Sequence, residues 1–330
     1  MPPPPRRPLI GLALGSGSAR GWAHIEERSV LRALTEAGIR PDVVCGASVG
    51  AIVGAAYATG ELDRFEAWVR GMNRRAVMSF MDFNLGGGML KGERLVNFMR
   101  ERFDDRPIEA LATPFAAVAT ALQTGDEVWL RSGSVTDAVR ASFALPGLFT
   151  PVWHGGRLLV DGGLVNPVPV SLARALGAEV VIAVDLNNDK LGRYFRAAQS
   201  DAGEPPRNAW MQSLQQGLGA LWPRTAGKGN GDAAASLAEP TPPLPSLMDV
   251  IADSLHVMQV RITRSRMAGD PPDAVVAPRL AHLGLLDFHR GEEAIAAGRA
   301  AAEEVLPLLR QRGLGDPPAP GAGTGTGHPA

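Results

Sequence analysis

The sequence predicts an α/β fold in which helices cover both faces of a sheet. Short apolar runs that are typical of buried strands alternate with helical stretches along the 330-residue chain. Hydrophobic residues make up 45% of the sequence, which is enough for a large core. Turns that contain glycine directly follow three of the runs, as they do where α/β folds keep their sites.

The expected strands share a short apolar pattern, and they cover residues 9–14, 43–45, 115–120, 128–130, 158–160, 180–184 and 274–278. Helices are expected from residue 49 to 60, from residue 246 past 262, and over 287–309. The second of these carries an apolar stripe at helical spacing, which predicts packing on the sheet. Its members are Leu247, Ile251, Leu255, Met258 and Ile262.

Composition predicts one folded domain over residues 9–310. Residues 1–8 are rich in proline and are expected to be flexible. An insertion at about 187–245 is dominated by Gly, Pro, Ala, Ser and Gln, and residues 311–330 are of low complexity. Because such segments cannot form a packed core, both are predicted to be disordered.

Charge and cysteine content exclude several classes of protein. The 33 Lys and Arg residues nearly balance the 34 Asp and Glu residues, without a dense basic stripe, so no nucleic-acid partner is expected. The single cysteine, Cys45, excludes an internal disulfide and indicates a reducing compartment, here the cytoplasm. No secretion signal and no span of roughly 20 apolar residues is evident, so contact with a membrane would be peripheral.

The first motif with chemical meaning is Gly46-Ala47-Ser48-Val49-Gly50, where an apolar strand turns directly into a helix. This layout is typical of a nucleophile elbow, in which Gly46 and Gly50 relieve crowding around an outward-facing serine. The helix that begins at Val49 aims unpaired N–H groups at that serine. The alternative is a serine that merely caps the helix.

A glycine-rich turn, Gly15-Ser16-Gly17-Ser18-Ala19-Arg20-Gly21, follows the first strand. A dinucleotide-binding loop fits poorly, because Arg20 stands where the third glycine of that fingerprint belongs. An oxyanion loop fits better, with backbone amides of Gly15, Ser16, Gly17 and Ser18 as donors. Arg20 is either a charge stabiliser or a structural clamp.

The third motif is Asp161-Gly162-Gly163, at the carboxyl end of a strand. An acid at this place in an α/β sheet is a candidate functional group. The alternative is an ordinary Asp-Gly turn.

Together, the three motifs make the chain resemble the patatin-like phospholipases, and in particular their small bacterial branch. Gly15 to Gly21 fits G-x-G-x-x-[RK]-G, Gly46 to Gly50 fits G-x-S-x-G, and Asp161 to Gly163 fits D-G-[AG]. The resemblance extends through residues 139–147, 165–169 and 267–273, and covers residues 9–310 apart from the insertion.

The resemblance implies a three-layer α/β/α sandwich around a mixed sheet. It also implies an enzyme that hydrolyses carboxylic esters of lipids through a catalytic dyad, with Ser48 as nucleophile and Asp161 as base. No metal or organic cofactor is implied, and the six histidines show no metal-ligand spacing. The expected partner is a lipid or fatty-acyl ester, with transient contact at a membrane surface as a further expectation.

Alternatives stay open at this point. His256, His282 and His289 follow Asp161 in the chain, so an ordinary Ser, Asp, His triad is the second mechanism. The same site could transfer the acyl group to an alcohol or act on thioesters, or the protein could be a binding module with little turnover. The chain departs from the family pattern by a short insertion at Glu26–Ser29, near the oxyanion loop. An apolar segment at 78–90 is either a mobile lid over Ser48 or ordinary core packing.

Overall fold

The computed structural model describes residues 6–24, 30–72, 75, 90, 92–102, 105–188, 247–284 and 287–316. Residues 1–191 and 251–330 belong to one compact unit, and residues 192–250 to a second unit of which only 247–250 are described. The insertion at Glu26–Ser29 and nearly all of the segments at 78–90 and 187–245 lie outside the described residues. No described helix is long and apolar enough to cross a bilayer.

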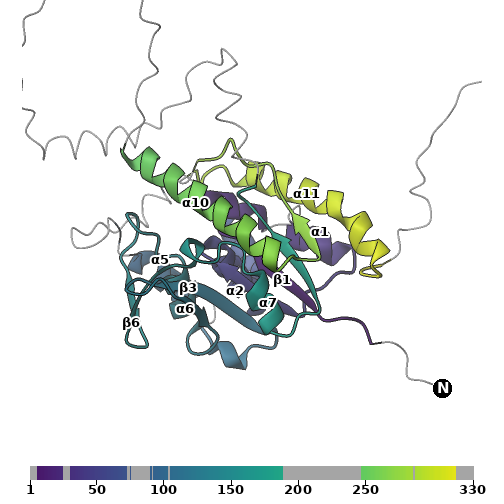
Figure 1. Ribbon diagram of the computed structural model, residues 1–330, viewed down its shortest axis with the longest axis horizontal. Helices are drawn as coiled ribbons and strands as arrows, with labels where there is room; N and C mark the ends of the chain where they lie inside the picture. The colour runs from purple at the N-terminus through teal and green to yellow at the C-terminus, as the bar shows by residue number, and fades with distance from the viewer. Residues whose placement is uncertain are drawn as a thin grey trace, which may run out of the picture. The chain divides into compact units, whose positions relative to one another are not determined.

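An eight-stranded mixed sheet forms the centre of the described chain, in the order β5-β6-β3-β2-β1-β7-β8, with β4 paired to β3 (Figure 1). The strands β1, β2, β3, β7 and β8 pair in parallel, and β4, β5 and β6 pair in antiparallel fashion. Their bounds are β1 Ile10–Leu14, β2 Val43–Ala47, β3 Phe115–Ala121, β4 Glu127–Leu130, β5 Val152–His154, β6 Arg157–Asp161, β7 Val180–Val184 and β8 Ala274–Val276. The predicted strands are confirmed, and β5 was missed because three partly exposed residues leave no apolar run.

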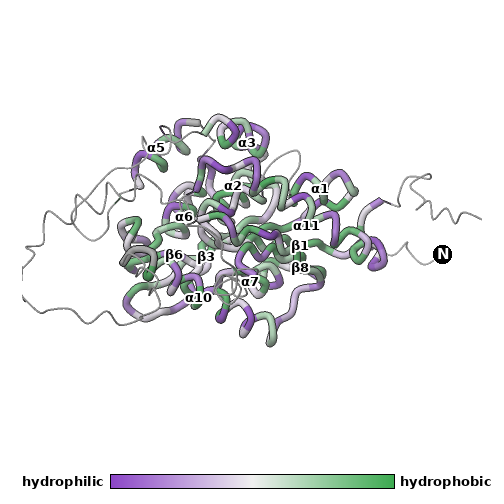
Figure 2. The backbone as a smooth tube through the Cα atoms, turned by 90° about the horizontal axis from the view of Figure 1, so that it is seen from above, coloured by the Kyte–Doolittle hydropathy of each residue, from purple (hydrophilic) through white to green (hydrophobic). Residues whose placement is uncertain are grey.

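Helices cover both faces of this sheet, which confirms the predicted three-layer α/β fold. Leu12 and Leu14 of β1 point into a core with α1, α2, α3 and α11, whereas Ala13 packs with α7 on the opposite face. Figure 2 shows α7 and α10 on one side of the strands and the other labelled helices on the other side. The helices are α1 Val30–Glu36, α2 Val49–Ala58, α3 Leu62–Arg70, α5 Glu93–Arg102, α6 Val135–Ser142, α7 Val170–Ala175, α10 Leu247–Gly269 and α11 Gly291–Gln311.

Strand β3 brings the ends of two distant strands together. Val118 pairs with Ala47 of β2 on one edge and with β4 on the other. One residue further, Ala119 pairs with Asp161 of β6. Because β4 continues along the opposite edge past Ala119, β2 and β6 follow one another on the same edge of β3. Ser48 and Asp161 therefore meet where these two strands end.

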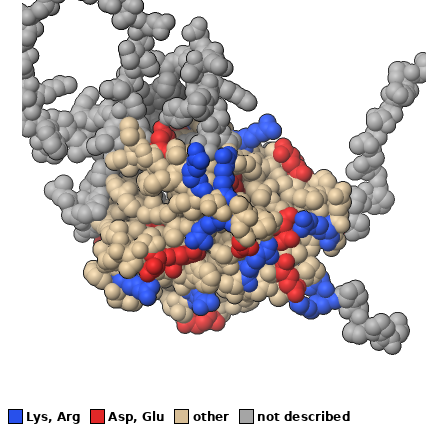
Figure 3. All heavy atoms as spheres, in the orientation of Figure 1, with Lys and Arg blue, Asp and Glu red and all other residues tan. Residues whose placement is uncertain are grey.

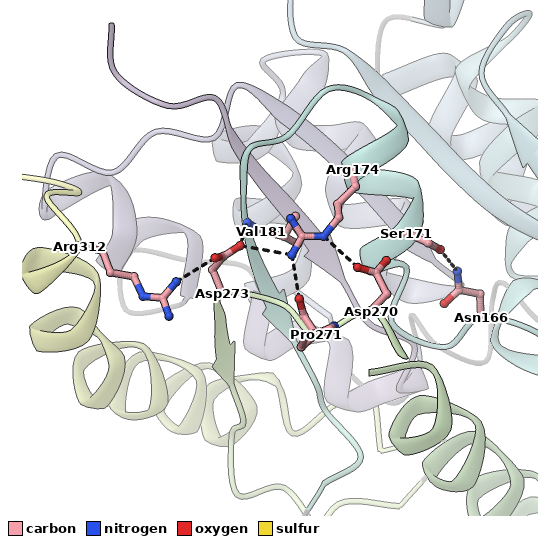
Figure 4. A network of polar contacts seen from close by, with 8 residues as sticks. All are labelled: Asn166, Ser171, Arg174, Val181, Asp270, Pro271, Asp273 and Arg312. Atoms are coloured by element: carbon pink, nitrogen blue, oxygen red, sulfur yellow. Dashed lines mark hydrogen bonds and ion pairs between the residues drawn. The ribbon is translucent and has the colours of Figure 1, made fainter. Parts of the chain in front are cut away.

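Two aspartates tie the last strand to the rest of the sheet (Figure 4). Asp273 accepts hydrogen bonds from the Val181 amide at 2.9 Å and from Arg312 at 2.8 Å. Arg174 of α7 donates to Asp270 at 2.9 Å and lies 3.5 Å from Asp273. These bonds give the 267–273 segment a structural role, since they join α7, β7 and the end of α11.

The predicted N-terminal and insertion boundaries need correction. Arg6 and Arg7 form ion pairs with Glu179 and Asp42 at 2.7 and 2.6 Å, so the expected flexible segment does not extend over them. Asn187 is fully buried, although the insertion was expected to start there. The partners of these polar side chains lie far along the chain, in turns and in α10, and composition does not reveal them.

The C-terminal boundary also needs correction. Helix α11 runs to Gln311, Leu314 is buried, and the Asp316 amide donates to the Ala37 carbonyl at 2.8 Å. Residues 311–316 are thus part of the folded unit, because one leucine after the helix reaches the core. The remainder of the predicted tail, 317–330, lies outside the described residues.

The apolar stripe predicted for α10 does not coincide with its buried face. Ile251 and Met258 are 38% and 48% exposed. The buried side chains are instead His256, Val260 and Thr263. Two of these three residues are polar, so the apolar stripe indicated a different side of the helix from the one that is buried. Over the face drawn in Figure 3, basic and acidic side chains are interspersed.

Candidate active site

Ser48 occupies a strained elbow between β2 and α2. Its backbone has φ 56° and ψ −123°, a conformation that is costly for a residue with a side chain. A Cβ on Gly46 would lie 2.3 Å from backbone atoms of Gly50, and a Cβ on Gly50 would lie 2.2 Å from the Leu14 carbonyl oxygen. The turn therefore requires glycine at both positions, which confirms the predicted crowding.

The Ser48 hydroxyl donates a hydrogen bond to Asp161 Oδ2 at 2.6 Å. The other carboxylate oxygen, Oδ1, accepts from the Gly163 amide at 2.7 Å. Asp161 is fully buried. Burial raises its pKa to about 6, although the bonds from Ser48 and Gly163 oppose this shift. The carboxylate is therefore a stronger base than an ordinary aspartate and is still ionised at neutral pH.

Hydrogen bonds to neighbouring strands and helices hold the backbones of Ser48 and Asp161 in place. The Ser48 amide donates to the hydroxyl of Ser142, which is fully buried at the end of α6, at 2.9 Å. Thr120 of β3 donates to the Asp161 carbonyl at 2.8 Å, and the Asp161 amide donates to the Ala144 carbonyl. Ser142 and Thr120 were not predicted from the sequence, because their role depends on contacts more than 40 residues away.

The glycine-rich turn lies beside the elbow, as a Cβ on Gly21 would lie 2.1 Å from Val49. The amides of Gly15 and Ser16 are already bonded, to the carbonyls of Val184 and Pro167 at 3.0 and 2.8 Å. This corrects the expectation that all four amides of the turn are available. In the described chain the amides of Gly17 and Ser18 bond no acceptor, which narrows the candidate oxyanion donors to these two.

Arg20 is 2% exposed and points toward the end of β7. Its guanidinium donates to Asn187 Oδ1 at 2.9 Å and to the Leu186 carbonyl at 3.4 Å. These contacts favour the structural clamp over the charge stabiliser. In the third motif, a Cβ on Gly162 would lie 2.1 Å from the Val118 carbonyl oxygen, so the turn after Asp161 is packed directly against β3.

An apolar pocket opens at Ser48, with an empty volume of about 920 Å³ that includes space open to solvent. Aromatic and aliphatic side chains make up its wall apart from two serines. The lining residues are Ser18, Trp22, Ser48, Val49, Ile52, Phe65, Trp68, Met72, Leu90, Leu95, Met99, Phe143, Leu145, Leu148, Phe149 and Phe288. Leu90 is the one described residue of the segment at 78–90 that reaches this pocket.

No histidine of the described chain bonds to Ser48 or Asp161. His282 lies 3.3 Å from Glu293 on the molecule's surface, and His256 is buried on α10. His24 contacts the Gly15 carbonyl through Nε2 at 3.1 Å, and burial lowers its pKa to about 4. It is therefore a neutral donor that fixes the glycine-rich turn. The described residues contain no group of side chains that could hold a metal ion.

The family model described as patatin-like phospholipase matches residues 12–174, a range that spans all three motifs. An uncharacterized NTE family protein of Mycobacterium tuberculosis is 32% identical over 337 residues, which is 91% of this chain and 91% of the relative.

One longer protein and one solved structure also match. The patatin-like phospholipase domain-containing protein 7 of Mus musculus is 35% identical over 187 residues, which cover 54% of this chain and 14% of the mouse protein. The crystal structure of VipD from Legionella pneumophila aligns with a TM-score of 0.42 and 13% identity, covering 92% of this chain and 67% of that one.

Proposed function

The chain belongs to the patatin-like phospholipase family, and we propose that it hydrolyses carboxylic esters of lipids through an acyl-enzyme on Ser48. The observation that carries this proposal is the 2.6 Å hydrogen bond from Ser48 to a buried carboxylate, at the wall of an apolar pocket. A nucleophile and a base in direct contact are the arrangement that acyl transfer requires.

In the first half of the proposed reaction, Ser48 Oγ attacks the ester carbonyl carbon while its proton passes to Asp161 Oδ2. The carbonyl oxygen becomes an oxyanion, which the amides of Gly17 and Ser18 would stabilise. Collapse of the tetrahedral intermediate breaks the bond to the alcohol. The departing oxygen takes the proton back from Asp161, and the acyl group stays on Ser48.

In the second half, water attacks the acyl carbon and gives its proton to Asp161. Collapse of that intermediate releases the fatty acid, and the proton returns to Ser48. Burial supports both steps, because a carboxyl group with a pKa of about 6 accepts a proton more readily than an ordinary aspartate. One well-placed oxyanion donor is worth about 3 kcal/mol of transition-state stabilisation.

The pocket supports an acyl chain as the group bound next to Ser48. Its wall has no charged side chain among the lining residues, so a hydrocarbon chain is favoured there over a polar group. A head group would lie outside this wall. Location in the cytoplasm stays a prediction from the single buried cysteine.

Two other functions use the same fold. An acyltransferase or thioesterase would share the acyl-enzyme, and products formed with competing alcohol or thiol acceptors separate it from a hydrolase. A binding module would share the fold without turnover. The direct hydrogen bond and the raised pKa of Asp161 favour an enzyme over a module.

The test is covalent labelling with a fluorophosphonate probe, together with hydrolysis of p-nitrophenyl esters, lysophospholipids and diacyl phospholipids. We expect the native protein to be labelled and active, and Ser48→Ala to be neither. Ser254→Ala, which changes an exposed serine on α10, is the matched control and should match the native protein. A folded native protein that is neither labelled nor active contradicts the proposal.

A further inference from the structure

Asn187 connects the glycine-rich turn to the end of β7. It is fully buried, and its side-chain Oδ1 accepts from the Arg20 guanidinium at 2.9 Å. Its Nδ2 donates to the Ser16 carbonyl at 3.1 Å. One amide thus holds both a side chain and a backbone group of the turn. Neither a hydrocarbon nor a carboxylate could make both bonds, since the first has no polar atoms and the second cannot donate.

Gln259 of α10 extends this chain of contacts to the turn at Gly163, whose amide bonds Asp161. Its Oε1 accepts from Asn187 Nδ2 at 3.3 Å. Its Nε2 lies 2.7 Å from the position that a Cβ on Gly163 would take. The same position is 2.9 Å from Asp161 Oδ1 and 3.0 Å from the Ser16 hydroxyl. The amide of Gln259 is therefore packed against the turn whose N–H group holds Asp161.

These contacts form one continuous path from Arg20 through Asn187 and Gln259 to Gly163. The glycine-rich turn and Asp161 are far apart in the sequence, and the pairing of β3 aligns only Ser48 with Asp161. Nothing in that strand pairing fixes where the amides of Gly17 and Ser18 lie relative to the carboxylate. Backbone bonds from Gly15 and Ser16 to the Val184 and Pro167 carbonyls hold the start of the turn, and the two side-chain amides add a direct connection from the turn to the Asp161 side of the site.

We propose that Asn187 and Gln259 are positioning residues that hold the oxyanion turn at a fixed distance from Asp161. This inference rests on the proposed function. Arg20 acts in it as the anchor of the turn, through its bond to Asn187, rather than as a group that meets the substrate. Helix α10 takes part in this positioning, because its residue Gln259 contacts both Asn187 and the turn at Gly163.

The first test compares Asn187→Leu and Gln259→Met with the native protein in ester hydrolysis. A misplaced oxyanion turn lowers kcat without changing ground-state binding, so we expect kcat to fall about 10- to 100-fold with KM nearly unchanged. The rate of fluorophosphonate labelling should fall in parallel. The controls are Asn188→Ala and Met258→Ala, which change the exposed neighbours of each residue.

A second readout uses Gln259→Glu. Gln259 Nε2 and Asp161 Oδ1 lie 2.7 and 2.9 Å from the same position, that of a Cβ on Gly163. A like charge that close raises a carboxyl pKa, by about one unit here. The acidic limb of the pH–rate profile should therefore move upward by about one pH unit. An acidic limb that stays in place would show that residue 259 does not lie against Asp161, which contradicts the positioning role.

The outcomes separate this inference from the proposed function. Amide variants that keep kcat within about two-fold of the native value, while Ser48→Ala is inactive, overturn the positioning role alone. A native protein that is neither labelled nor active overturns the proposed function. If Asn187→Leu does not fold, Gln259→Met and Gln259→Glu decide, because Gln259 is only half-buried on a helix surface.

Discussion

Ser48 and Asp161 are 113 positions apart in the sequence, yet the serine hydroxyl donates to the carboxylate at 2.6 Å. Strand β3 causes this contact, since its consecutive residues Val118 and Ala119 pair with Ala47 and Asp161. Ala47 directly precedes Ser48, and Asp161 is itself one of the two reacting residues. The distance between nucleophile and base is thus set by backbone pairing, and not by flexible side chains.

Asp161→Asn should lose ester hydrolysis by at least about 10³-fold, because a carboxamide cannot accept the serine proton. In the native protein, the rate should fall as the pH drops below about 6, where Asp161 becomes protonated. A pH–rate profile of kcat/KM checks both points. Hydrolysis that survives in Asp161→Asn would exclude Asp161 as the base, and the triad with His256, His282 or His289 would then be tested by substituting each histidine.

Asp161 and His24 should make opposite contributions to the pH dependence of the free energy of unfolding. Asp161 has a raised pKa of about 6, so its contribution to folding is present below pH 4 and is lost as the pH rises through 6. His24 has a lowered pKa of about 4, so its contribution is present above pH 6.5 and is lost as the pH falls through 4. Each amounts to about 3 kcal/mol.

Substituting one of the two residues should leave the pH-dependent stability contribution of the other one visible. In Asp161→Asn the free energy of unfolding should rise with pH between 4 and 6.5, and at pH 7 it should exceed the native value by about 2–3 kcal/mol. In His24→Gln it should decrease over the same range. Urea unfolding at several pH values measures both. Equal slopes in the two variants would contradict the assignment.

Gly46→Ala should destabilise the protein by more than about 3 kcal/mol or prevent folding, because the new methyl group would lie 2.3 Å from the Gly50 backbone. Gly54→Ala, in the helix α2 that follows the elbow, is the control. There the nearest atoms are side-chain carbons of Phe115 and Val44 at 3.1 Å, so an effect within about 1 kcal/mol is expected. Urea midpoints compare the two variants, and equal losses would argue against the crowded elbow.

Met72→Trp should shorten the preferred acyl chain, because the larger side chain would fill space in the pocket next to Ser48. Hydrolysis of long-chain p-nitrophenyl esters should fall about ten-fold relative to acetate and butyrate esters. Leu308→Trp, at an exposed position of α11, is the control. An unchanged chain-length profile would show that the acyl group binds elsewhere.

The sequence by itself determined the fold class and the three motifs. Strand and helix signals are local, so an apolar run such as 180–184 or a glycine pair such as Gly46 and Gly50 keeps its meaning in any fold that contains it. The elbow was predicted from those two glycines and the serine between them, and the structure then showed the strained backbone of Ser48. Ser48 and Asp161 could therefore be named as candidates before any contact was known.

Only the tertiary structure decided which backbone amides of the glycine-rich turn are free to bind an oxyanion, and which residues hold the motifs in place. Carbonyls of Val184 and Pro167 occupy two amides of the glycine-rich turn, and Asn187 engages Arg20. The buried face of α10 also differs from its apolar stripe. Such facts depend on strand register and on partners far along the chain, and local propensity carries no information about either.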